Sequence, residues 1–338
     1  EGKSYLRQAG LHSDKMIEGF SMLTERVRQN GSRIFAQLAH GGRQSLVQGV
    51  RPAAPSFGMP DLIYKVVPRS MGVKEILKAI QDFGSAALRA KKAGFDGIQI
   101  HGAHGYLVNE FLSPYFNRRT DEWGGTPENR FRFLKRVYES IRESVGTDYP
   151  ITIKLNVSDH TPGTDIPIEE VVEQATHLVA MGIDAIEISC GTLAYSMFHS
   201  SRGKVPVKGF SRTQPILMQP LASFLLNRAF PEENYTFEEA YNLWASSYIK
   251  PVLGDVPLIL VGGLRTFQTM EPIVQEGKAD FISLSRPLIR EPFLVKKWQE
   301  EREGENGNWR IPTCLNCNKC YVGVANHKAL TCNEQQVF

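Results

Sequence analysis

Short apolar runs alternate along the chain with longer segments in which apolar residues recur every three or four positions. The six runs cover residues 33–38, 97–101, 151–155, 185–189, 257–261 and 281–285. Each run is rich in Ile, Leu or Val, as expected for a strand that is buried on both faces of a parallel sheet. Helical spacing marks the longer segments, most clearly residues 76–93 and 129–145. The pattern predicts an α/β protein.

Three segments of similar sequence indicate repeated βα units. Residues 93–100 resemble residues 181–188, and residues 277–284 are a looser copy. In each segment a Gly is suited to end a helix, an Asp is suited to turn the chain, and an apolar run begins directly afterwards. Repeated units of this kind predict a parallel sheet.

Polar residues or glycines end every predicted strand, which favours a closed TIM (β/α)8 barrel over an open doubly wound sheet. They are Gln37, His40, His101, His104, Lys154, Ser189, Gly262, Gly263 and Arg286. In such barrels the chemistry gathers at the C-terminal ends of the strands. Because only six units are found, the barrel is expected to lack its first two βα units. We expect it to cover residues 1–300, with a Cys-rich tail over residues 301–338.

Two connecting segments stand out. Residues 117–125 are polar and rich in turn formers, and a helix is expected to follow, with Thr126 as its N-cap and Pro127 in its first turn. We therefore expect this segment to fix the loop that precedes the helix. Residues 194–257 show little periodicity at first and predict a large loop at the active-site face, with a helical stretch over residues 237–249.

Composition and charge exclude several classes of protein. Hydrophobic residues make up 42% of the chain and charged residues 22%, which excludes disorder and fibrous repeats. No apolar run approaches the ~18–20 residues of a membrane span, so no membrane partner is expected. The net charge of +3 is too small to indicate a nucleic-acid partner. A small-molecule substrate is expected instead, and assembly into a homo-oligomer is left open.

The densest group of reactive side chains comprises His101, the last residue of the second apolar run, with His104 and Tyr106 directly after it. Two His three residues apart could bind a metal, could donate hydrogen bonds to an anionic oxygen, or could be structural. A metal would need a third ligand from another strand end, where Lys154 and Gln37 are poor ligands. We therefore favour anion binding, with Tyr106 as a general acid, because a phenol pKa of about 10 suits proton donation to carbon.

The last two predicted strands carry a candidate phosphate site. Gly262 and Gly263 follow one strand, and glycines let backbone N–H groups approach a phosphate. Ser285 and Arg286 end the next strand, where Arg286 is suited to clamp the same group. A plain turn is the alternative for the two glycines.

Two further strand residues each allow two interpretations. Lys154 is expected to face an anionic or electron-rich ligand, or else to pair with Asp159 or Glu187. Gln37 offers a donor and an acceptor to an amide-like ring edge, or else it bonds the strand backbone.

Four of the five cysteines stand in the last twenty-five residues, at Cys314, Cys317, Cys320 and Cys332. Four thiolates can hold zinc or an iron–sulfur cluster, and three close Cys with one remote Cys is nearer to cluster spacing. Buried Cys without a metal is the alternative. The clustering suggests a reducing compartment, so a cytoplasmic location is expected.

Residues 93–132 closely resemble the old yellow enzyme family of FMN-dependent NAD(P)H:flavin oxidoreductases. The similarity is carried by residues 101–107, 111–114 and 117–125. Residues 37–43 look like the third barrel strand of that family. Residues 261–263 and 285–289 look like its seventh and eighth strands, and the resemblance extends over essentially the whole chain. The family's first two strands would precede Glu1, so an incomplete barrel is expected.

The resemblance implies a TIM barrel that holds FMN. Gln37 would contact the pyrimidine edge of the flavin, His101 would also contact the cofactor, and Lys154 would replace the usual Arg near flavin N1. The phosphate would be held by Gly262, Gly263, Ser285 and Arg286.

The same resemblance implies the reaction. NAD(P)H would reduce FMN, and hydride would then pass to the β carbon of an α,β-unsaturated carbonyl compound. His101 and His104 would bind the carbonyl oxygen and stabilise the enolate, and Tyr106 would protonate the α carbon. Neither the substrate nor the choice between NADH and NADPH follows from the sequence.

The tail is similar to the subgroup that includes dienoyl-CoA reductase and trimethylamine dehydrogenase, which carry a [4Fe–4S] cluster on such cysteines. An iron–sulfur flavoprotein that uses one-electron transfer is therefore the main alternative function. Two other hypotheses are a non-catalytic barrel that scaffolds partners and has a zinc tail, and a metal-dependent hydrolase that uses His101 and His104. The hydrolase lacks a third metal ligand in the sequence.

Overall fold

A computed structural model describes residues 2–4, 8–45, 47, 49–58, 67–303, 309–325 and 328–332 of the chain. These residues form two compact units. The first unit comprises residues 1–197 and 247–258, and the second comprises residues 198–246 and 259–338. The cysteine-containing tail therefore belongs to the second unit. The division expected at residue 300 stays a prediction.

All six predicted strands are present. They are β1 (Phe35–Leu38), β4 (Gly97–Gly102), β5 (Ile151–Asn156), β6 (Ala185–Ser189), β7 (Leu258–Val261) and β8 (Phe281–Ser283). The pairs β1–β4, β4–β5 and β5–β6 in the first unit and β7–β8 in the second are parallel. Within the described residues, β1, β4, β5 and β6 follow one another in sequence order in the first unit, and β7 lies beside β8 in the second. The fold is α/β with a six-stranded parallel half-barrel sheet, which agrees with a partial TIM barrel.

Helices connect the strands. The first unit contains α1 (Ile17–Gln29), α2 (Val73–Lys92), α3 (Leu107–Leu112), α4 (Pro127–Val145) and α5 (Ile168–Ala180), with a small sheet of β2 (Ala53–Ala54) and β3 (Arg69–Ser70). The second contains α6 (Val207–Ser211), α7 (Gln219–Ala229), α9 (Phe267–Gln275), α10 (Arg286–Arg290), α11 (Leu294–Glu303) and α12 (Lys319–Ala325), and α8 (Leu243–Ile249) crosses the division.

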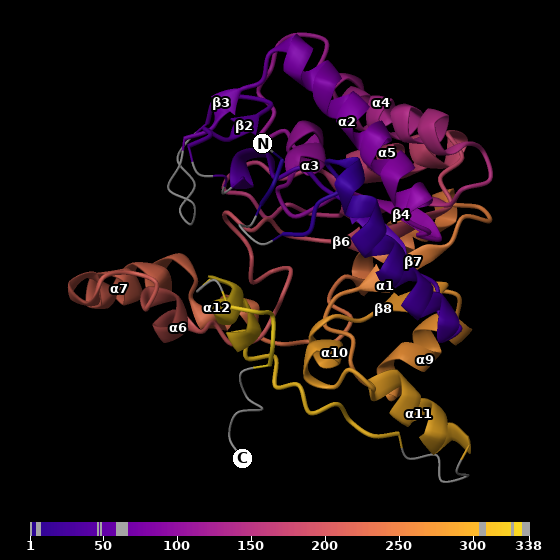
Figure 1. Ribbon diagram of the computed structural model, residues 1–338. Helices are drawn as coiled ribbons and strands as arrows, with labels where there is room; N and C mark the ends of the chain where they lie inside the picture. Colours follow the sequence, from indigo (N-terminus) through magenta and orange to yellow (C-terminus); the bar gives the residue numbers. More distant parts are fainter. Residues whose placement is uncertain are drawn as a thin grey trace. The chain divides into compact units, whose positions relative to one another are not determined.

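The start of α4 is the one that the sequence predicts. The Thr126 hydroxyl accepts a hydrogen bond from the backbone N–H of Asn129, and Pro127 is the first helical residue. The cap supplies an acceptor for one of the N–H groups that a helix leaves unpaired at its N-terminus. The apolar face of α4 packs against α2, which lies alongside it in Figure 1. Deeper in the unit, the rings of Phe111 and Phe133 stack with centroids 4.1 Å apart.

The insertion at residues 194–257 is more helical than the sequence predicts. It contains α6 and α7, and the helical stretch expected at residues 237–249 is confined to Leu243–Ile249. The sequence pattern misses α7 because its large apolar side chains do not form a buried stripe. Leu217, just before the helix, is 93% exposed, and Phe224 and Leu225 are 62% and 54% exposed. A hydrophobic period is informative only where one helix face is buried.

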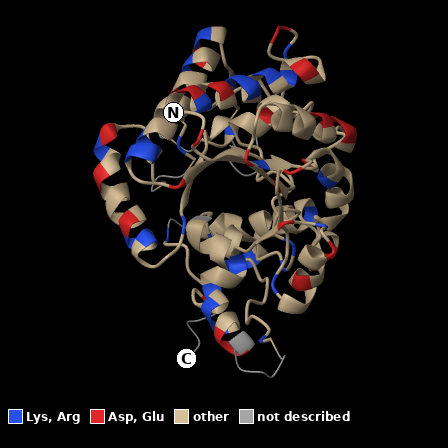
Figure 2. Cartoon of the chain, turned by 90° about the vertical axis from the view of Figure 1, so that its right-hand side faces the viewer, with Lys and Arg blue, Asp and Glu red and all other residues tan. Residues whose placement is uncertain are grey.

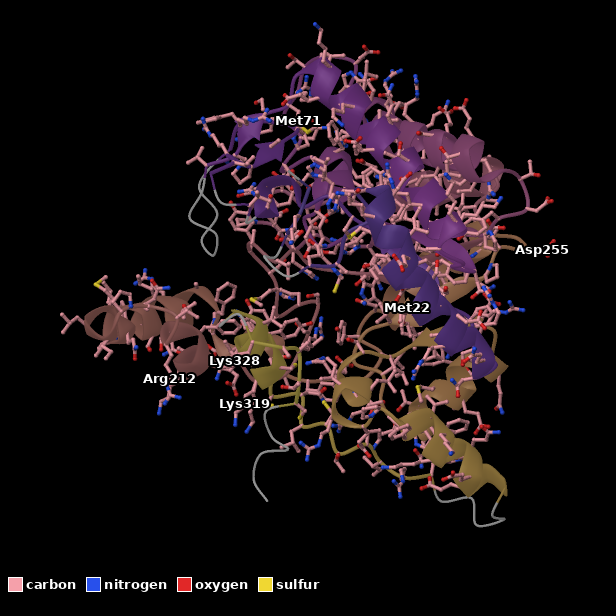
Figure 3. The ribbon with its side chains drawn as sticks, viewed as in Figure 1. Met22, Met71, Arg212, Asp255, Lys319 and Lys328 are labelled. Atoms are coloured by element: carbon pink, nitrogen blue, oxygen red, sulfur yellow. The ribbon has the colours of Figure 1, made fainter. Side chains whose placement is uncertain are left out.

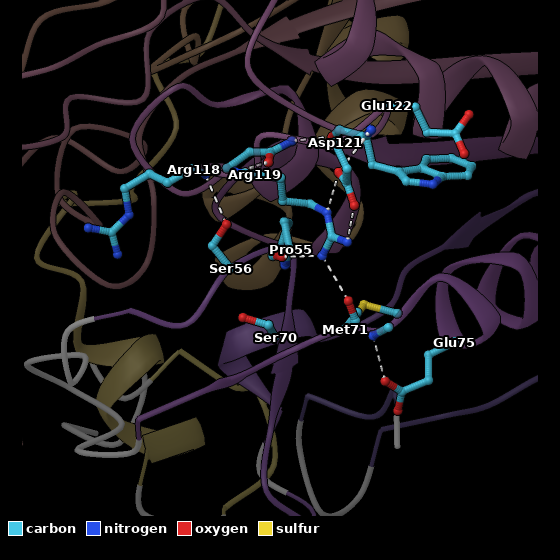
Figure 4. A network of polar contacts seen from close by, with 12 residues as sticks. Pro55, Ser56, Ser70, Met71, Glu75, Arg118, Arg119, Asp121 and Glu122 are labelled. Carbon is cyan, nitrogen blue, oxygen red and sulfur yellow. Dashed lines mark hydrogen bonds and ion pairs between the residues drawn. The ribbon is translucent and has the colours of Figure 1, made fainter.

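The predicted structural role of residues 117–125 is confirmed by the polar network in Figure 4. The Arg119 guanidinium pairs with Asp121 and donates to the backbone carbonyls of Pro55 and Met71 at 2.8 and 2.7 Å. The backbone N–H of Arg118 donates to the Ser56 hydroxyl. These bonds fasten the segments beside β2 and β3 to the loop that follows α3.

Exposure differs sharply between the two labelled methionines of the first unit. Met22 on α1 is 71% exposed. Met71, whose backbone carbonyl accepts a hydrogen bond from Arg119, is 4% exposed (Figure 3).

Basic and acidic residues alternate along several helices in Figure 2, in keeping with the small net charge. Among the described residues, no helix combines the length and apolarity needed to cross a membrane.

The contact between α2 and α4 depends on one glycine, and we expect Gly84→Ala to destabilise the protein. A Cβ at residue 84 would lie 2.8 Å from the carbonyl oxygen of Ser140 on α4, so the helices would have to move apart. Overpacking of this kind costs about 1–3 kcal/mol. Gly19→Ala on α1 is the matched control, because its Cβ would meet nothing within 4 Å. That change should stabilise by up to about 1 kcal/mol. Urea denaturation followed by circular dichroism measures both, and equal effects of the two changes would contradict the expectation.

Candidate active site at the end of β4

Three predicted catalytic side chains lie together where β4 ends. His101 is the fifth residue of β4, and Tyr106 stands at the N-cap position of α3. The His101 ring contacts both partners, with centroids 5.2 Å from the His104 ring and 4.8 Å from the Tyr106 ring. His101 and Tyr106 are 6% and 8% exposed. The structure therefore brings together the two imidazoles and the phenol that the sequence singles out.

A left-handed turn sets the direction of His104. Its φ is 63°, which is uncommon for a residue other than glycine, and the φ of Gly105 is 76°. The turn forms a parallel bridge with Thr192 in the segment after β6. Nε2 of His104 lies 2.7 Å from the hydroxyl of Ser189, the last residue of β6. The ring is thus fixed from a neighbouring strand end.

Both histidines are uncharged at neutral pH. Burial, together with the neighbouring His104 and Lys154, holds the pKa of His101 well below its ordinary value. Burial and the Lys154 charge lower the pKa of His104 to about 3. A neutral imidazole has one N–H donor and one acceptor nitrogen. Nδ1 of His101 is buried and has no hydrogen-bond partner among the described residues.

Lys154 belongs to a polar chain that crosses four strands. Its Nζ lies 2.5 Å from Oε1 of Glu187 on β6, and the two residues are register partners. The second carboxylate oxygen of Glu187 accepts from the Gln99 amide on β4 at 2.8 Å. Gln37 on β1 in turn donates to the Gln99 amide oxygen at 2.5 Å. Of the two interpretations of Lys154, pairing with Glu187 is therefore observed. Gln37 bonds a side chain rather than the strand backbone.

The predicted phosphate residues all lie in the second unit. Gly262 and Gly263 follow β7 with φ of 137° and 70°, and a Cβ on Gly263 would lie 2.5 Å from the carbonyl oxygen of Glu238. Both glycines are thus required by backbone conformation and close packing. Ser285 directly precedes α10, and Arg286 is its first residue.

The Arg286 guanidinium is buried and partly engaged by protein. Its Nη1 donates to the carbonyls of Ser201 and Arg202 and to Oδ1 of Asn318. All the hydrogen bonds that Arg286 makes with described residues use this one nitrogen. A guanidinium has five N–H donors, so Nε and Nη2 keep donors for a ligand.

The four tail cysteines are free thiols in the second unit. Nη1 of Arg290 lies 3.4 Å from Sγ of Cys332, and Nη1 of Arg265 donates to the Cys314 carbonyl. Burial raises the pKa of the Cys320 thiol. Within the described part of the chain, no three His, Cys, Asp or Glu side chains are grouped closely enough to hold a metal ion. Ligation of a cluster by Cys314, Cys317, Cys320 and Cys332 stays a prediction.

A cavity of about 240 Å³ lies in the first unit beside α3. Its walls include Arg43, Phe116, Arg118 and Tyr195. The Arg43 guanidinium lies 4.8 Å from the Phe116 ring centroid and 5.6 Å from that of Tyr195. Tyr195 belongs to the start of the insertion at residues 194–257, which the sequence predicts at the active-site face. Phe198 and Arg202 of the same insertion belong to the second unit, where Phe198 is buried among aromatic rings.

Sequence reasoning misses the buried residues that support this site. Asn109, Asn156 and Asp159 are at most 1% exposed and are hydrogen-bonded to one another behind the His104 turn. Asn109 could have been found from its position three residues after Tyr106, one helical turn along α3. Asn156 and Asp159 offer no comparable signal, because their partners are set by strand register.

Comparison with known proteins supports the resemblance. Residues 1–214 match the model of the NADH:flavin oxidoreductase/NADH oxidase family. The chain is 34% identical over 326 residues to an NADH oxidase of Thermoanaerobacter brockii, covering 96% of this chain and 44% of that protein. It is 33% identical over 298 residues to an NADPH dehydrogenase of Bacillus subtilis (strain 168), covering 88% of this chain and 75% of that protein.

The fold is also similar to a solved structure of 2-naphthoyl-CoA reductase in complex with 2-naphthoyl-CoA. The TM-score is 0.79 at 27% sequence identity, over 98% of this chain and 47% of that one. The chain thus spans less than half the length of this protein and of the NADH oxidase. The family match covers well over half of the chain and includes the residues at the end of β4. The chain belongs to the old yellow enzyme, or NADH:flavin oxidoreductase/NADH oxidase, family.

Proposed function

We propose that this protein is an NAD(P)H-dependent flavoenzyme that reduces the carbon–carbon double bond of an α,β-unsaturated carbonyl compound. The observation that carries the proposal is the contact of His101 with His104 and Tyr106, with a buried nitrogen of His101 that no described residue satisfies. Neutral imidazoles and a phenol in contact supply the N–H and O–H donors that a developing enolate needs.

The residues present fit FMN. In the first unit, Gln37 offers an amide and Lys154 a positive charge, both fixed by hydrogen bonds and the Glu187 ion pair. In the second unit, Gly262 and Gly263 place no side chain beside the backbone, and Arg286 keeps donors for a phosphate. The chemistry that FMN supplies when bound is hydride transfer from NAD(P)H to the β carbon of the acceptor.

The side chains at the end of β4 take up the charge and supply the proton. His101 and His104 donate hydrogen bonds to the substrate carbonyl oxygen, on which negative charge develops as the β carbon accepts hydride. For His104 this role requires a proton on Nδ1, and the Ser189 hydroxyl, which can donate or accept, would then donate to Nε2. The Tyr106 O–H gives its proton to the α carbon.

The names of the relatives support this reaction class. An NADH oxidase and an NADPH dehydrogenase both use a reduced nicotinamide, and 2-naphthoyl-CoA is an aromatic acyl thioester. A conjugated carbonyl is common to the last compound and to the substrate class proposed here. The clustering of four of the five cysteines in the tail is more typical of a metal site in a reducing compartment than of a disulfide framework, so a cytoplasmic location is part of the proposal. A homo-oligomer stays a prediction.

Tyr106→Phe tests the proposed proton donor. With FMN bound, the wild-type protein should be yellow and should couple NAD(P)H oxidation to reduction of cyclohex-2-enone. The variant should bleach at the wild-type rate when NAD(P)H is added without oxygen, because the hydroxyl acts only on the acceptor. Reoxidation by cyclohex-2-enone should slow by about 10²–10⁴-fold, the usual contribution of a general acid.

The control for this change is Tyr149→Phe, which removes a hydroxyl that donates to the Phe95 carbonyl away from the site. It should leave both half-reactions unchanged. A wild-type protein that stays colourless after FMN is added would overturn the flavoenzyme proposal, and normal reoxidation of Tyr106→Phe would overturn the role of the phenol.

The low histidine pKa values predict a loss of stability in acid. The unfolded chain protonates His104 near its ordinary pKa of 6.5, whereas the folded chain does so at about 3. Between these values the unfolded state binds more protons, so the free energy of unfolding falls as the pH falls. One such histidine contributes at most about 1.4 kcal/mol per pH unit.

His104→Gln should therefore flatten the decline in stability between about pH 6 and pH 4, the window in which only the unfolded chain protonates this histidine. Urea unfolding at several pH values measures the slope. The slope is compared with that of His40→Gln. Burial lowers the pKa of His40 to about 4, so this histidine is also protonated in the unfolded chain before it is protonated in the folded chain. A decline in His104→Gln as steep as in the wild type would contradict the assigned pKa.

A second candidate is the iron–sulfur flavoprotein. It is favoured by the similarity to 2-naphthoyl-CoA reductase, which extends over 98% of the chain and so includes the tail. Iron and acid-labile sulfide analysis of anaerobically prepared protein decides between the candidates. About four irons per chain, lost in Cys317→Ser but not in Cys190→Ser, would support it. A yellow protein without iron would remove it.

A further inference from the structure

Three fully buried polar side chains meet behind the candidate active site. Asn109 comes from α3, Asn156 ends β5, and Asp159 lies in the loop that follows β5. They are 1%, 1% and 0% exposed. Oδ1 of Asp159 accepts hydrogen bonds from both amides, at 2.9 Å from Asn109 and 2.8 Å from Asn156. A single carboxylate oxygen thus joins a helix to a strand end.

The opposite ends of the two amides face the catalytic turn. Oδ1 of Asn156 accepts from the backbone N–H of His104 at 3.3 Å, and Oδ1 of Asn109 accepts from that of Gly105 at 2.7 Å. Burial raises the pKa of the Asp159 carboxyl, and its Oδ1 is the acceptor in both contacts. It therefore requires the NH₂ group of each amide to face Asp159 and the amide oxygen to face the turn. Asp159 is thus the acceptor that orients both amides in common.

The turn needs such support. A left-handed backbone is unfavourable for a residue with a Cβ, and His104 adopts it with a φ of 63°. The strain persists only where the surroundings hold the conformation. The unfavourable backbone conformation of His104 fixes the direction of its side chain. It points Nε2 of His104 at Ser189 and brings the ring against His101.

Further bonds extend the group to the next strand end. Nδ2 of Asn156 also donates to the carbonyl of Gly191 at 3.0 Å. The Ser196 hydroxyl donates to the Asp159 backbone carbonyl and accepts from the N–H of Thr192, the residue that bridges His104. The group therefore holds the turn after β4 against the segment after β6, and that arrangement sets the distance between His104 and Ser189.

We propose that Asp159 is a positioning residue for the reaction, acting through Asn109 and Asn156 to hold His104 and Gly105 in the conformation that aims His104 and Tyr106 at the acceptor. The proposal rests on the proposed function in naming the acceptor. Its structural part, that Asp159 sets the geometry of His104, is independent of it. Asp159 contacts neither FMN nor substrate in this role.

Two substitutions of Asp159 separate positioning from charge. Asp159→Ala removes the shared acceptor. The Asn109 amide then keeps only the bonds through its oxygen, whereas Asn156 still donates to the Gly191 carbonyl. Asp159→Asn keeps an oxygen at the place of Oδ1 and puts an NH₂ group at the place of Oδ2. The buried hydroxyl of Ser113, which lies beside the carboxylate, can accept from that group. The amide variant should therefore restore the function that the alanine variant loses.

The first measurement is of the two half-reactions of the FMN-loaded protein. In Asp159→Ala, reoxidation by cyclohex-2-enone should slow by roughly 10²-fold, the usual effect of a catalytic group displaced by about 1 Å. Reduction by NAD(P)H should stay within about threefold of the wild type, because it does not use the turn. Asp159→Asn should keep reoxidation within about threefold. Asn109→Ala should show a smaller loss of the same kind, since it frees only the Gly105 N–H.

The second measurement does not depend on activity. Long-range ¹H–¹⁵N spectra of histidine-labelled protein report the tautomer and surroundings of each imidazole, and His104→Gln assigns the signal of His104. That signal should shift in Asp159→Ala and stay at the wild-type position in Asp159→Asn. Gln174→Ala is the matched control, because it truncates a buried amide on α5 that bonds Glu170 instead. It should leave the position of the His104 signal and the rates of both half-reactions unchanged.

Each outcome bears on the proposal. A wild-type rate and an unshifted His104 signal in Asp159→Ala overturn it. So does an Asp159→Asn variant that is as impaired as Asp159→Ala, because orientation of the amides would then not be what matters. Equal loss of both half-reactions with collapse of the spectrum would indicate a merely structural role and also overturns it. If the wild type does not reduce the enone at all, the proposed function fails, and the His104 signal alone decides the role of Asp159.

Discussion

The first unit depends on one constraint: polar side chains at the ends of β4, β5 and β6 are buried, so each must find a partner inside the protein. An unpaired buried polar group costs about 1–3 kcal/mol, and an unpaired buried charge costs more. Lys154 meets the constraint with Glu187, and Asn156 meets it with Asp159 and the His104 turn. His101 does so only in part, because its Nδ1 finds no partner among the described residues. That nitrogen lies among the proposed catalytic side chains.

The same burial decides the chemistry that these groups can perform. Burial and the nearby Lys154 lower the pKa of His101 and of His104, so in the proposed reaction both would act as hydrogen-bond donors rather than as acids. In that proposal proton donation is left to Tyr106, whose hydroxyl can take part without first becoming charged. Strand register supports this division of roles, since His101 and Lys154 are partners across β4 and β5.

Much of the fold could be predicted from the sequence, because buried strands and a capped helix leave local signals. All six apolar runs contain strands in the structure, and Thr126 and Pro127 mark the start of α4. The His101, His104 and Tyr106 group could be predicted because it follows a strand directly. The partners of these residues could not, since Gln37 meets Gln99 and Asn109 meets Asp159 only once strands and helices are placed side by side. The helix α7 was missed because its apolar residues face outward.

The pairing of Lys154 with Glu187 also limits how this site can evolve. Glu187 is buried and the Lys154 side chain is 13% exposed, and each charge is neutralised mainly by the other. Losing either one alone would leave an uncompensated charge between β5 and β6. A change from Lys to Arg at residue 154 keeps the pair, whereas a change to a neutral residue is tolerated only together with a change at residue 187. The two positions should therefore covary among relatives. A relative in which only one of them is charged would need different hydrogen bonds among the side chains that link residue 154 to Gln37.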